Sequence, residues 1–467
     1  MGRAQIIVSA LGLVLTAASL LVMFPLWKPT TPGWWVVKAL PTTLSPLMLI
    51  IGLLVFSYGI RHSSNLLIFV GAWLALFFAV HILIITLPPS NTTGFLQAFD
   101  KQKIDRVSGG KEPYRLKTRL GFGAPKVPAP VFNQDIVFYT LPATGRKLLC
   151  DVWEPQQDIK GSGLAVVYLH GSAWCVWDKD AGTRKFFRHL TAQGHVVMDV
   201  AYRLYPETNI QGMVHDVKHA VSWIKENADT YGIDPSRVVL CGGSAGGHLS
   251  LLSAYTGSHP LFTPSDLIGK DIRVRGVISL YGPTDLTDLY HHTGQDVVYE
   301  RRKLKATRVA EMPKWIRSLM GEHAYQRLGL YKDPSQTFLP DILGDTPENM
   351  PETYQLFSPV THVHRACPPT LLLQGKHDLI TSAKSTQAFY AKLRSAGVPA
   401  VMHLFPQLDH AYDLLLPGIS PSAHNTYFDV DQFLGLINID VSEMEIETNE
   451  LNTIAELPGL DHPPISR

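Results

Sequence analysis

The stretch VVLCGGSAGGH at residues 238–248 joins a short apolar run, a glycine-rich turn and the start of a helix-like segment. The turn carries Ser244 in a G-x-S-x-G pattern, with a glycine two positions before it and another two positions after it. A strand that turns sharply into a helix strains its central residue, and the flanking glycines let neighbouring backbone approach closely. A glycine-rich turn without chemistry is the alternative. The strand–turn–helix context favours Ser244 as a nucleophile at the carboxyl end of a buried strand.

Outward from this motif, short β-branched runs alternate with longer helical stretches, which predicts an α/β fold with a mostly parallel sheet. The expected strands cover residues 135–141, 147–153, 164–169, 195–201, 238–241, 274–280, 370–373 and 400–405. The expected helices cover residues 184–192, 213–231, 247–255, 383–396 and 427–436. We expect these elements to form one domain over residues 132–438.

A serine nucleophile needs a base to accept its proton and a carboxylate to orient that base. Asp378 follows the strand at 370–373, and His410 follows the strand at 400–405. The carboxyl ends of parallel strands lie at one edge of a sheet, so we expect both side chains near Ser244. A serine, a histidine and a carboxylate that act together in this way form a catalytic relay. In one class of enzymes with such a relay, the serine, the acid and the histidine follow one another in this order along the chain. Asp285 is the reserve candidate for the acid.

The strand at 164–169 is followed by the small residues of His170-Gly171-Ser172-Ala173. Small residues directly after a strand leave backbone N–H groups free to point into a cavity. We expect the N–H of Ser172, with that of Gly171 or Ala173, and the N–H of Ala245 to bind an oxyanion. A plain strand-to-helix loop is the alternative, and the nearby nucleophile motif favours the oxyanion loop.

The amino-terminal part of the chain is strongly apolar. Hydrophobic residues make up 46% of the sequence and charged residues only 17%, which favours a membrane portion. Three apolar runs, at residues 4–27, 44–60 and 66–87, predict three transmembrane helices within residues 1–90. A cleaved signal peptide would explain the first run but not the two that follow it.

Basic residues near the ends of these runs predict the orientation. One side carries Arg3 and Arg61, and the other carries Lys28, Lys38, Lys101, Lys103 and Arg106. The positive-inside rule then places the catalytic domain in the cytoplasm, although the sequon at residues 91–93 favours the opposite orientation. Trp34, Trp35 and Lys38 are expected to anchor the chain at the membrane interface.

The rest of the chain predicts connecting segments. A basic, Gly/Pro-containing linker along the membrane surface is expected at 91–131, a lid insertion at about 289–350, and a flexible acidic tail at 439–467. Within the insertion, a basic amphipathic helix at 301–319 is expected either to lie on an anionic bilayer or to cover the pocket. Lys+Arg 41 against Asp+Glu 40 gives no indication of nucleic acid, and the 4 Cys lack the spacing of a metal site.

Several segments in order resemble the hormone-sensitive-lipase-like and acetyl-esterase branch of the α/β-hydrolase superfamily. They are YLHGSAWC (168–175), AYRLYPE (201–207), YGIDPSRVVLCGGSAGGHLS (231–250), YGPTDLT (281–287), SPVTHV (358–363), LLLQGKHD (371–378) and DHAYD (409–413). The resemblance implies an α/β-hydrolase fold with an eight-stranded sheet and a helical lid, and a carboxylic-ester hydrolase without a cofactor or metal. It implies Ser244 as nucleophile, Asp378 as acid and His410 as base. The family's H-G-G-G is H-G-S-A here, which keeps the backbone donors but adds two β-carbons.

We therefore expect a membrane-anchored serine carboxylesterase that acts on lipid-like or amphipathic esters at the bilayer. Tethered isoprenylcysteine methylesterases and arylacetamide-deacetylase-like enzymes are similar in combining apolar spans with these motifs. An amidase or deacetylase that uses the same three residues is one alternative. A non-catalytic hydrolase-fold binding protein is the other, and such a protein usually lacks one member of the relay.

Overall fold

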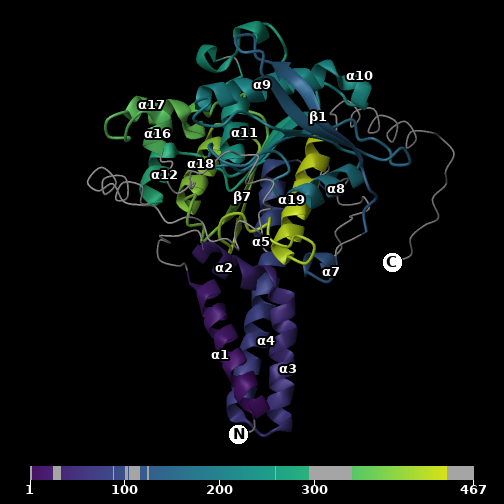
Figure 1. The fold of residues 1–467 in the computed structure, drawn as a ribbon, viewed down its shortest axis with the longest axis vertical. Coiled ribbons are helices and arrows are strands. Elements are labelled where there is room, and N and C mark those ends of the chain that lie inside the picture. The colour runs from purple at the N-terminus through teal and green to yellow at the C-terminus, as the bar shows by residue number, and fades with distance from the viewer. Residues whose placement is uncertain are drawn as a thin grey trace, which may run out of the picture.

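The computed structural model describes residues 3–24, 33–87, 89–99, 104, 116–123, 126–257, 259–293 and 339–438. The predicted basic helix at 301–319, most of the predicted lid insertion and the predicted acidic tail lie outside these residues. Figure 1 shows two parts, an α/β domain and a group of amino-terminal helices that extends away from one end of it.

The α/β domain is built on an 8-stranded sheet with the order β1-β2-β4-β3-β5-β6-β7-β8. The strands are β1 (Val131–Thr140), β2 (Lys147–Glu154), β3 (Ala165–Leu169), β4 (Val196–Val200), β5 (Val238–Gly243), β6 (Gly276–Leu280), β7 (Thr370–Gly375) and β8 (Ala400–Phe405). The β1–β2 and β2–β4 pairs are antiparallel, and the other pairs are parallel. This arrangement confirms the predicted mostly parallel, eight-stranded fold.

Helices cover both faces of the sheet. They are α8 (Arg184–Ala192), α9 (Ile210–Glu226), α10 (Ala228–Tyr231), α11 (Ala245–Tyr255), α12 (Leu286–His292), α16 (Leu339–Leu343), α17 (Pro351–Phe357), α18 (Ala383–Ser395) and α19 (Pro421–Asn438), with 3-10 turns η1 (Pro260–Phe262), η2 (Ser265–Leu267) and η4 (Pro359–His362). Side chains of α9 and α11 fill one core, and side chains of α8 and α19 fill the other. Because both faces are covered, the residues of β3 and β5 are all buried, which explains their continuous apolar runs.

Several predicted boundaries differ from the observed ones. The helix predicted at 213–231 is two helices, because α9 ends at Glu226 and α10 begins at Ala228. Asn209 caps the start of α9 by accepting a hydrogen bond of 3.0 Å from the Gly212 N–H. The last helix begins at Pro421 rather than at 427. The Asn209 cap accounts for the start of α9, whereas the prediction followed apolar periodicity alone.

The amino-terminal helices are α1 (Arg3–Met23), α2 (Gly33–Thr43), α3 (Ser45–Arg61) and α4 (Asn65–Thr86). Among the residues that the structure describes, two helices, not the predicted three, are long and apolar enough to cross a bilayer, within Gln5–Met23 and Asn65–Thr86. The third, α3, has 17 residues. At the usual rise it extends about 26 Å, less than the roughly 30 Å of a hydrocarbon core.

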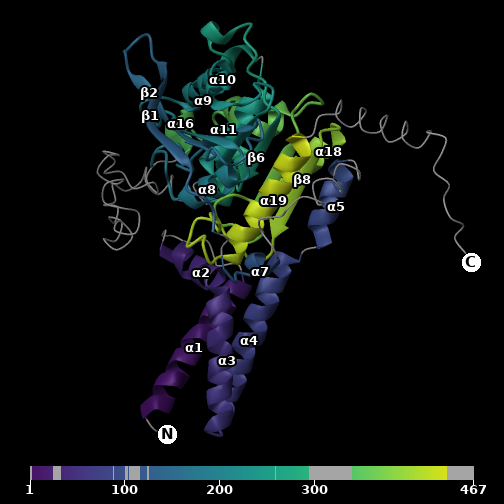
Figure 2. The same ribbon diagram turned by 90° about the vertical axis from the view of Figure 1, so that its right-hand side faces the viewer.

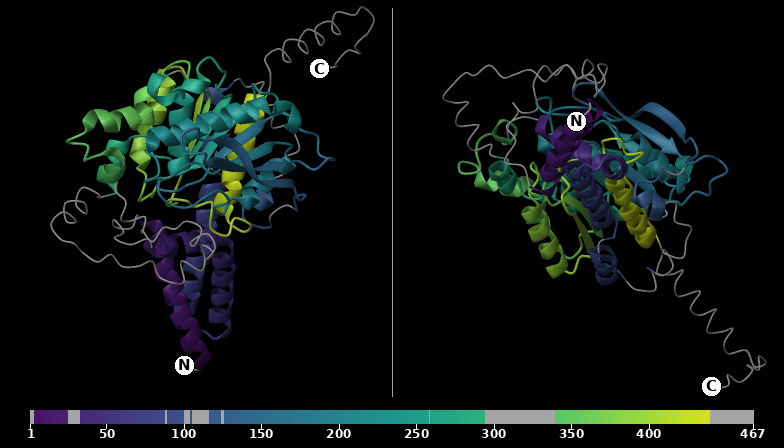
Figure 3. Two further views of the ribbon diagram at one scale, coloured as in Figure 1. Left: turned by 45° about the horizontal axis from the view of Figure 1, so that its top comes forward. Right: turned by 90° about the horizontal axis from the view of Figure 1, so that it is seen from below.

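Helices α1, α3 and α4 lie together beneath the α/β domain (Figures 1 and 2). Glycines permit close packing of α3 against α4, because a β-carbon at Gly71 would lie 2.2 Å from the Phe56 nitrogen. Helix α2 occupies part of the stretch between the first two predicted apolar runs. It lies between these helices and the domain, and the view from below shows the amino-terminal helices nearly end-on in front of the domain (Figure 3).

The predicted linker at 91–131 contains most of α5 (Pro89–Ala98) and all of α7 (Leu116–Arg119). Helix α5 packs beside β8, and its Gln97 carbonyl accepts a 2.9 Å hydrogen bond from Arg394. In α7, Arg119 donates to the Thr86 carbonyl at 2.7 Å and to Asn425 at 3.0 Å. These contacts tie the end of α4 to the α/β domain.

Candidate active site

Ser244 lies in the turn between β5 and α11. Its backbone adopts φ 53° and ψ −122°, a left-handed φ that is rare for a residue with a β-carbon. The Ser244 N–H donates to the Leu280 carbonyl of β6 at 2.9 Å, and its own carbonyl accepts from the His248 N–H at 3.0 Å. The strain is therefore held by the neighbouring strand and by the first turn of α11, as the G-x-S-x-G pattern predicts.

The two flanking glycines let three backbone segments meet. A β-carbon at Gly242 would lie 2.5 Å from the Gly246 carbonyl group, and one at Gly246 would lie 2.0 Å from the Leu169 oxygen of β3. Both contacts are with backbone atoms, which cannot rotate away. Any side chain at these positions would push α11 away from the sheet and displace Ser244.

Replacing Gly246 with alanine is expected to destabilise the fold by about 3 kcal/mol, the upper range for overpacking a core. Ester hydrolysis is expected to fall as well, because the turn that holds Ser244 moves. Thermal unfolding of the purified variant measures the first effect. Gly257→Ala is the matched control, since a β-carbon there meets nothing within 4 Å. Equal stability of the two variants would contradict this account of the turn.

The structure brings the three predicted relay residues together. His410 Nε2 lies 2.9 Å from Ser244 Oγ, and His410 Nδ1 lies 2.9 Å from Asp378 Oδ2. Asp378 follows β7 and His410 follows β8, so both reach the same sheet edge as Ser244. Chain order and strand ends predicted that these three side chains would lie together, and their catalytic roles stay predictions.

Hydrogen bonds fix the Asp378 carboxylate. Its Oδ1 accepts from the N–H groups of Ile380 and Thr381, both at 2.8 Å. Its Oδ2 also accepts from the Thr381 hydroxyl and the Gln374 amide, each at 2.8 Å. Burial raises the pKa of Asp378, but the adjacent His410 and the bonds from Thr381 outweigh burial, and the net pKa is lowered. The carboxylate is therefore ionised at neutral pH and positioned to accept from His410.

Burial lowers the pKa of His410, but Asp378, Asp409 and Asp413 outweigh it and raise the net pKa above the ordinary value. A base must be neutral to accept the serine proton, so activity is expected to be lost as the pH falls through this pKa. We expect the acid limb of the kcat/KM profile to have its midpoint above about 6.5, the ordinary value of histidine. A pH series with p-nitrophenyl acetate measures it, and a midpoint below that value would contradict the assignment of His410.

The predicted oxyanion loop lies beside the serine. A β-carbon on Gly171 would lie 3.3 Å from Ser244 Cβ. Among the described hydrogen bonds, none uses the N–H groups of Gly171, Ser172 or Ala173. Ala245 is the first residue of α11, so its N–H has no acceptor within the helix. These groups are the donors expected to bind an oxyanion.

The side chain of Ser172 is held away from the serine. Its hydroxyl lies 2.7 Å from the Tyr202 hydroxyl and accepts from the Trp174 N–H at 3.0 Å. Tyr202 in turn donates to the His170 carbonyl at 2.7 Å. Ser172 thus braces the loop, and sequence reasoning missed Tyr202 because its partner lies 30 residues away.

Other residues near the relay have structural contacts. Asp285, the reserve acid, caps α12 by accepting from the N–H groups of Thr287 and Asp288, so it has a different role. Tyr281 places its ring 4.7 Å from the His410 ring and donates to Asp413 at 2.7 Å. Across the residues that the structure describes, no cluster of three or more potential metal ligands is present.

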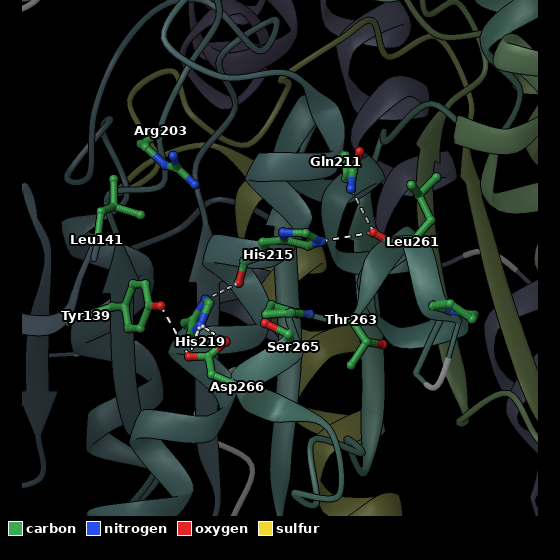
Figure 4. Close-up of a pocket in the computed structure, with 12 residues that line it drawn as sticks. Tyr139, Leu141, Arg203, Gln211, His215, His219, Leu261, Thr263, Ser265 and Asp266 are labelled. Atoms are coloured by element: carbon green, nitrogen blue, oxygen red, sulfur yellow. Dashed lines mark hydrogen bonds and ion pairs between the residues drawn. The ribbon is translucent and has the colours of Figure 1, made fainter. Parts of the chain in front are cut away.

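A cavity of about 590 Å³ lies elsewhere, between β1, α9 and the turns η1 and η2. Figure 4 shows Tyr139, His219 and Asp266 on one side of it, with His215 and Gln211 directed to the Leu261 carbonyl. The lining residues do not include Ser244, Asp378 or His410. This cavity is therefore separate from the candidate active site.

Comparison with known proteins shows what this chain is similar to. Residues 150–323 match the BD-FAE family model, and residues 324–427 match the prolyl oligopeptidase family. The chain is 30% identical over 294 residues to the probable carboxylic ester hydrolase LipM of Mycobacterium tuberculosis, covering 62% of this chain and 58% of LipM. It is 22% identical over 316 residues to the probable isoprenylcysteine alpha-carbonyl methylesterase ICME of Oryza sativa subsp. japonica, covering 66% of this chain and 64% of that protein.

Among solved structures, the apo form of Thermogutta terrifontis esterase 2 aligns with a TM-score of 0.46 and 19% identity, over 66% of this chain and 95% of that chain. The fold, the nucleophile turn and the family matches define an α/β-hydrolase. Within that superfamily, the chain is similar to proteins named as esterases. It spans less than two thirds of the length of the mycobacterial relatives, 58% for LipM and 60% for the esterases LipQ and LipC.

Proposed function

We propose that this protein is a membrane-anchored serine hydrolase that cleaves carboxylic esters through Ser244, His410 and Asp378. The observation that carries the proposal is the continuous chain of contacts from Ser244 Oγ through His410 to Asp378, each of 2.9 Å. A nucleophile, a base within hydrogen-bond reach and a third group that orients the base are the parts that acyl transfer requires.

In the first half of the reaction, His410 Nε2 accepts the hydroxyl proton as Ser244 Oγ attacks the ester carbonyl carbon. The carbonyl oxygen becomes an oxyanion, stabilised by the N–H groups of Ser172 and Ala245, with Gly171 or Ala173 as a further donor. The imidazolium then gives its proton to the departing alkoxide, and the alcohol leaves an acyl-Ser244 enzyme. The Asp378 carboxylate stabilises the imidazolium and keeps a proton on Nδ1.

In the second half, His410 takes a proton from water, and the resulting hydroxide attacks the acyl carbon. The tetrahedral intermediate collapses, Ser244 Oγ recovers the proton from His410, and the carboxylic acid departs. No cofactor or metal takes part. The polar donors lie in backbone held by β3 and α11, so they need little reorganisation during the reaction.

The proposed substrates are lipid-like or amphipathic esters at the bilayer, with the catalytic domain on the cytoplasmic side. Two observations support this class. The amino-terminal helices are apolar, with mean hydropathies of 2.5 and 2.6 over the two longest. The loop that carries His410 contacts these helices, since His81 of α4 lies 2.8 Å from Gln407. The reacting edge of the sheet therefore faces the proposed membrane side, where an amphipathic ester is concentrated.

A series of p-nitrophenyl esters of increasing acyl length, measured with and without anionic lipid vesicles, tests the proposal. We expect hydrolysis by the full chain in detergent or vesicles, with higher kcat/KM for longer acyl chains. The same relay can act on amides, so p-nitroacetanilide is included, and a preference for it would favour the amidase or deacetylase alternative. Absence of all hydrolysis by folded protein would contradict the proposal and favour a binding protein.

A further inference from the structure

The amino-terminal helix α2 places a lysine inside the hydrolase domain. The Lys38 side chain is 0% exposed, and its Nζ lies 4.0 Å from Oδ2 of Asp409, whose side chain is 3% exposed. The sequence predicted Lys38 as an interfacial anchor, and that prediction is wrong because the side chain is directed into protein. Among the described residues, neither Lys38 Nζ nor Asp409 Oδ2 has a hydrogen-bond partner. Each charged atom therefore has the other as its neighbouring opposite charge.

Asp409 joins the two loops that carry the acid and the base. Its other oxygen, Oδ1, accepts from the Leu379 N–H at 3.0 Å and from the His410 N–H at 2.7 Å. Leu379 directly follows Asp378, so one carboxylate holds the backbone next to the acid and the backbone of the base itself. Rotation of this carboxylate would change the separation of Asp378 and His410.

Burial opposes both charges of the pair, so the net pKa of Asp409 is raised and that of Lys38 is lowered, and each partner offsets part of this effect. Burial raises the pKa of Asp409 and Asp378 raises it further, whereas Lys38 lowers it. Burial lowers the pKa of Lys38, and Asp409 followed by Asp378 raises it. Removing one member of such a pair leaves an uncompensated buried charge, which is far more costly than replacing both. The Asp409 carboxylate thus depends on a residue more than three hundred and fifty positions earlier in the chain.

A second contact leads to the same loop from α4. His81 Nδ1 lies 2.8 Å from Gln407 Oε1, two residues before Asp409. Two different amino-terminal helices therefore hold the four-residue segment that ends at His410. Such double support is more than a tether needs, because a tether requires no contact with the catalytic loops.

We propose that Lys38 is a positioning residue for the relay. Its ammonium group holds the Asp409 carboxylate in place, and this carboxylate fixes the separation of Asp378 and His410. Hydrolysis therefore depends on the position of α2 against the hydrolase domain. This inference rests on the proposed function. It predicts that the charge of a residue outside the hydrolase domain controls turnover without touching substrate.

Replacing Lys38 with methionine keeps the length of the side chain and removes its charge. We expect kcat to fall by about 100-fold, the cost of a small misplacement of reacting groups, while KM changes little. Asp409→Asn keeps the shape and the accepting oxygen of the carboxylate, and we expect a smaller loss. The double variant is expected to be more active than Lys38→Met, because the uncompensated carboxylate is absent.

The pH profile separates positioning from general structure. His410 is faced by Asp378, Asp409, Asp413 and Tyr281, with Lys38 beside Asp409 and His377 beside Lys38. Removing the Lys38 cation makes the surroundings of His410 more negative, so the acid limb of kcat/KM is expected to move to higher pH. Asp409→Asn removes a negative charge and is expected to move the limb to lower pH. The double variant is expected to lie between them.

The experiment measures kcat, KM and the acid limb for the full-length wild type, the two single variants and the double variant. Rates are normalised to the fraction of protein labelled by a fluorophosphonate, so unfolded molecules do not contribute. Lys225→Met is the matched control, because Lys225 is a mostly buried lysine, 8% exposed, paired with Asp271 at 3.0 Å and without contact to the relay. It is expected to retain wild-type kinetics.

Opposite shifts of the acid limb in the two single variants, with partial recovery in the double variant, would support the inference. Wild-type kcat and an unshifted limb in Lys38→Met would overturn it. If Lys38→Met does not fold, the Asp409→Asn variant provides the test. We expect the acid limb of its kcat/KM profile to move to lower pH, and an unshifted limb would overturn the inference. Failure of the proposed function is separate, because it would appear as no Ser244-dependent hydrolysis by the wild type.

Discussion

Replacing Ser244 with alanine is expected to lower kcat for p-nitrophenyl acetate by about a million-fold, the loss seen when the nucleophile of such a relay is removed. Alanine has no group that can form the acyl-enzyme, so only binding and the oxyanion donors remain. Stopped assays with concentrated enzyme measure the residual rate. Because His410 stays in place in this variant, the measurement tests the contribution of the Ser244 hydroxyl alone.

The fold of the Ser244→Ala variant is expected to be unchanged. Its backbone contacts to Leu280 and His248 use only main-chain atoms, and alanine tolerates the φ of 53° as well as serine does. Ser395→Ala, at an exposed position at the end of α18, is the control and is expected to keep full activity. Wild-type turnover by Ser244→Ala would remove Ser244 from the mechanism.

Asp378→Asn is expected to give the second largest effect, a fall in kcat of about ten thousand-fold. The amide nitrogen would donate toward His410 Nδ1, which favours the tautomer with its proton on Nε2. That tautomer cannot accept the Ser244 proton. The shape of the side chain is retained, so Ile380 and Thr381 still find an accepting oxygen.

Asp285→Asn provides the comparison, since Asp285 is the other carboxylate that the sequence offered as the acid. It caps α12, and asparagine caps helices about as well as aspartate does. We expect unchanged kcat and nearly unchanged stability. If Asp285→Asn lost activity while Asp378→Asn kept it, the observed contact between Asp378 and His410 would have no catalytic meaning.

The fold and the relay could be predicted from sequence because their signals are local. Alternating apolar runs predict the strands, and a strand end places Ser244, Asp378 and His410 at one edge. The supporting residues carry no such signal. Thr381 and Gln374 orient Asp378 from three and four residues away, but neither residue type is unusual in a loop. Tyr202 and Ser172 meet only after folding.

Lys38 shows where local reasoning fails. A lysine between two apolar runs is typical of a membrane interface, and nothing near it in sequence indicates a partner at Asp409. The number of spans was overestimated for a related reason. The predicted run at 44–60 is as short as α3 itself, which has 17 residues, whereas a typical transmembrane helix needs about 20. Burial against α4, through Gly52, Gly59 and Gly71, also makes a run apolar.

The most direct test of the account is to identify the atom that becomes acylated. The full-length protein is mixed with excess p-nitrophenyl acetate, quenched with acid within the first turnover and digested for mass spectrometry. We predict an acetyl group on the peptide that contains Ser244, approaching one per folded molecule, and its absence from Ser244→Ala. Turnover without acetylated Ser244, or acetylation of another residue in step with turnover, would contradict the central claim.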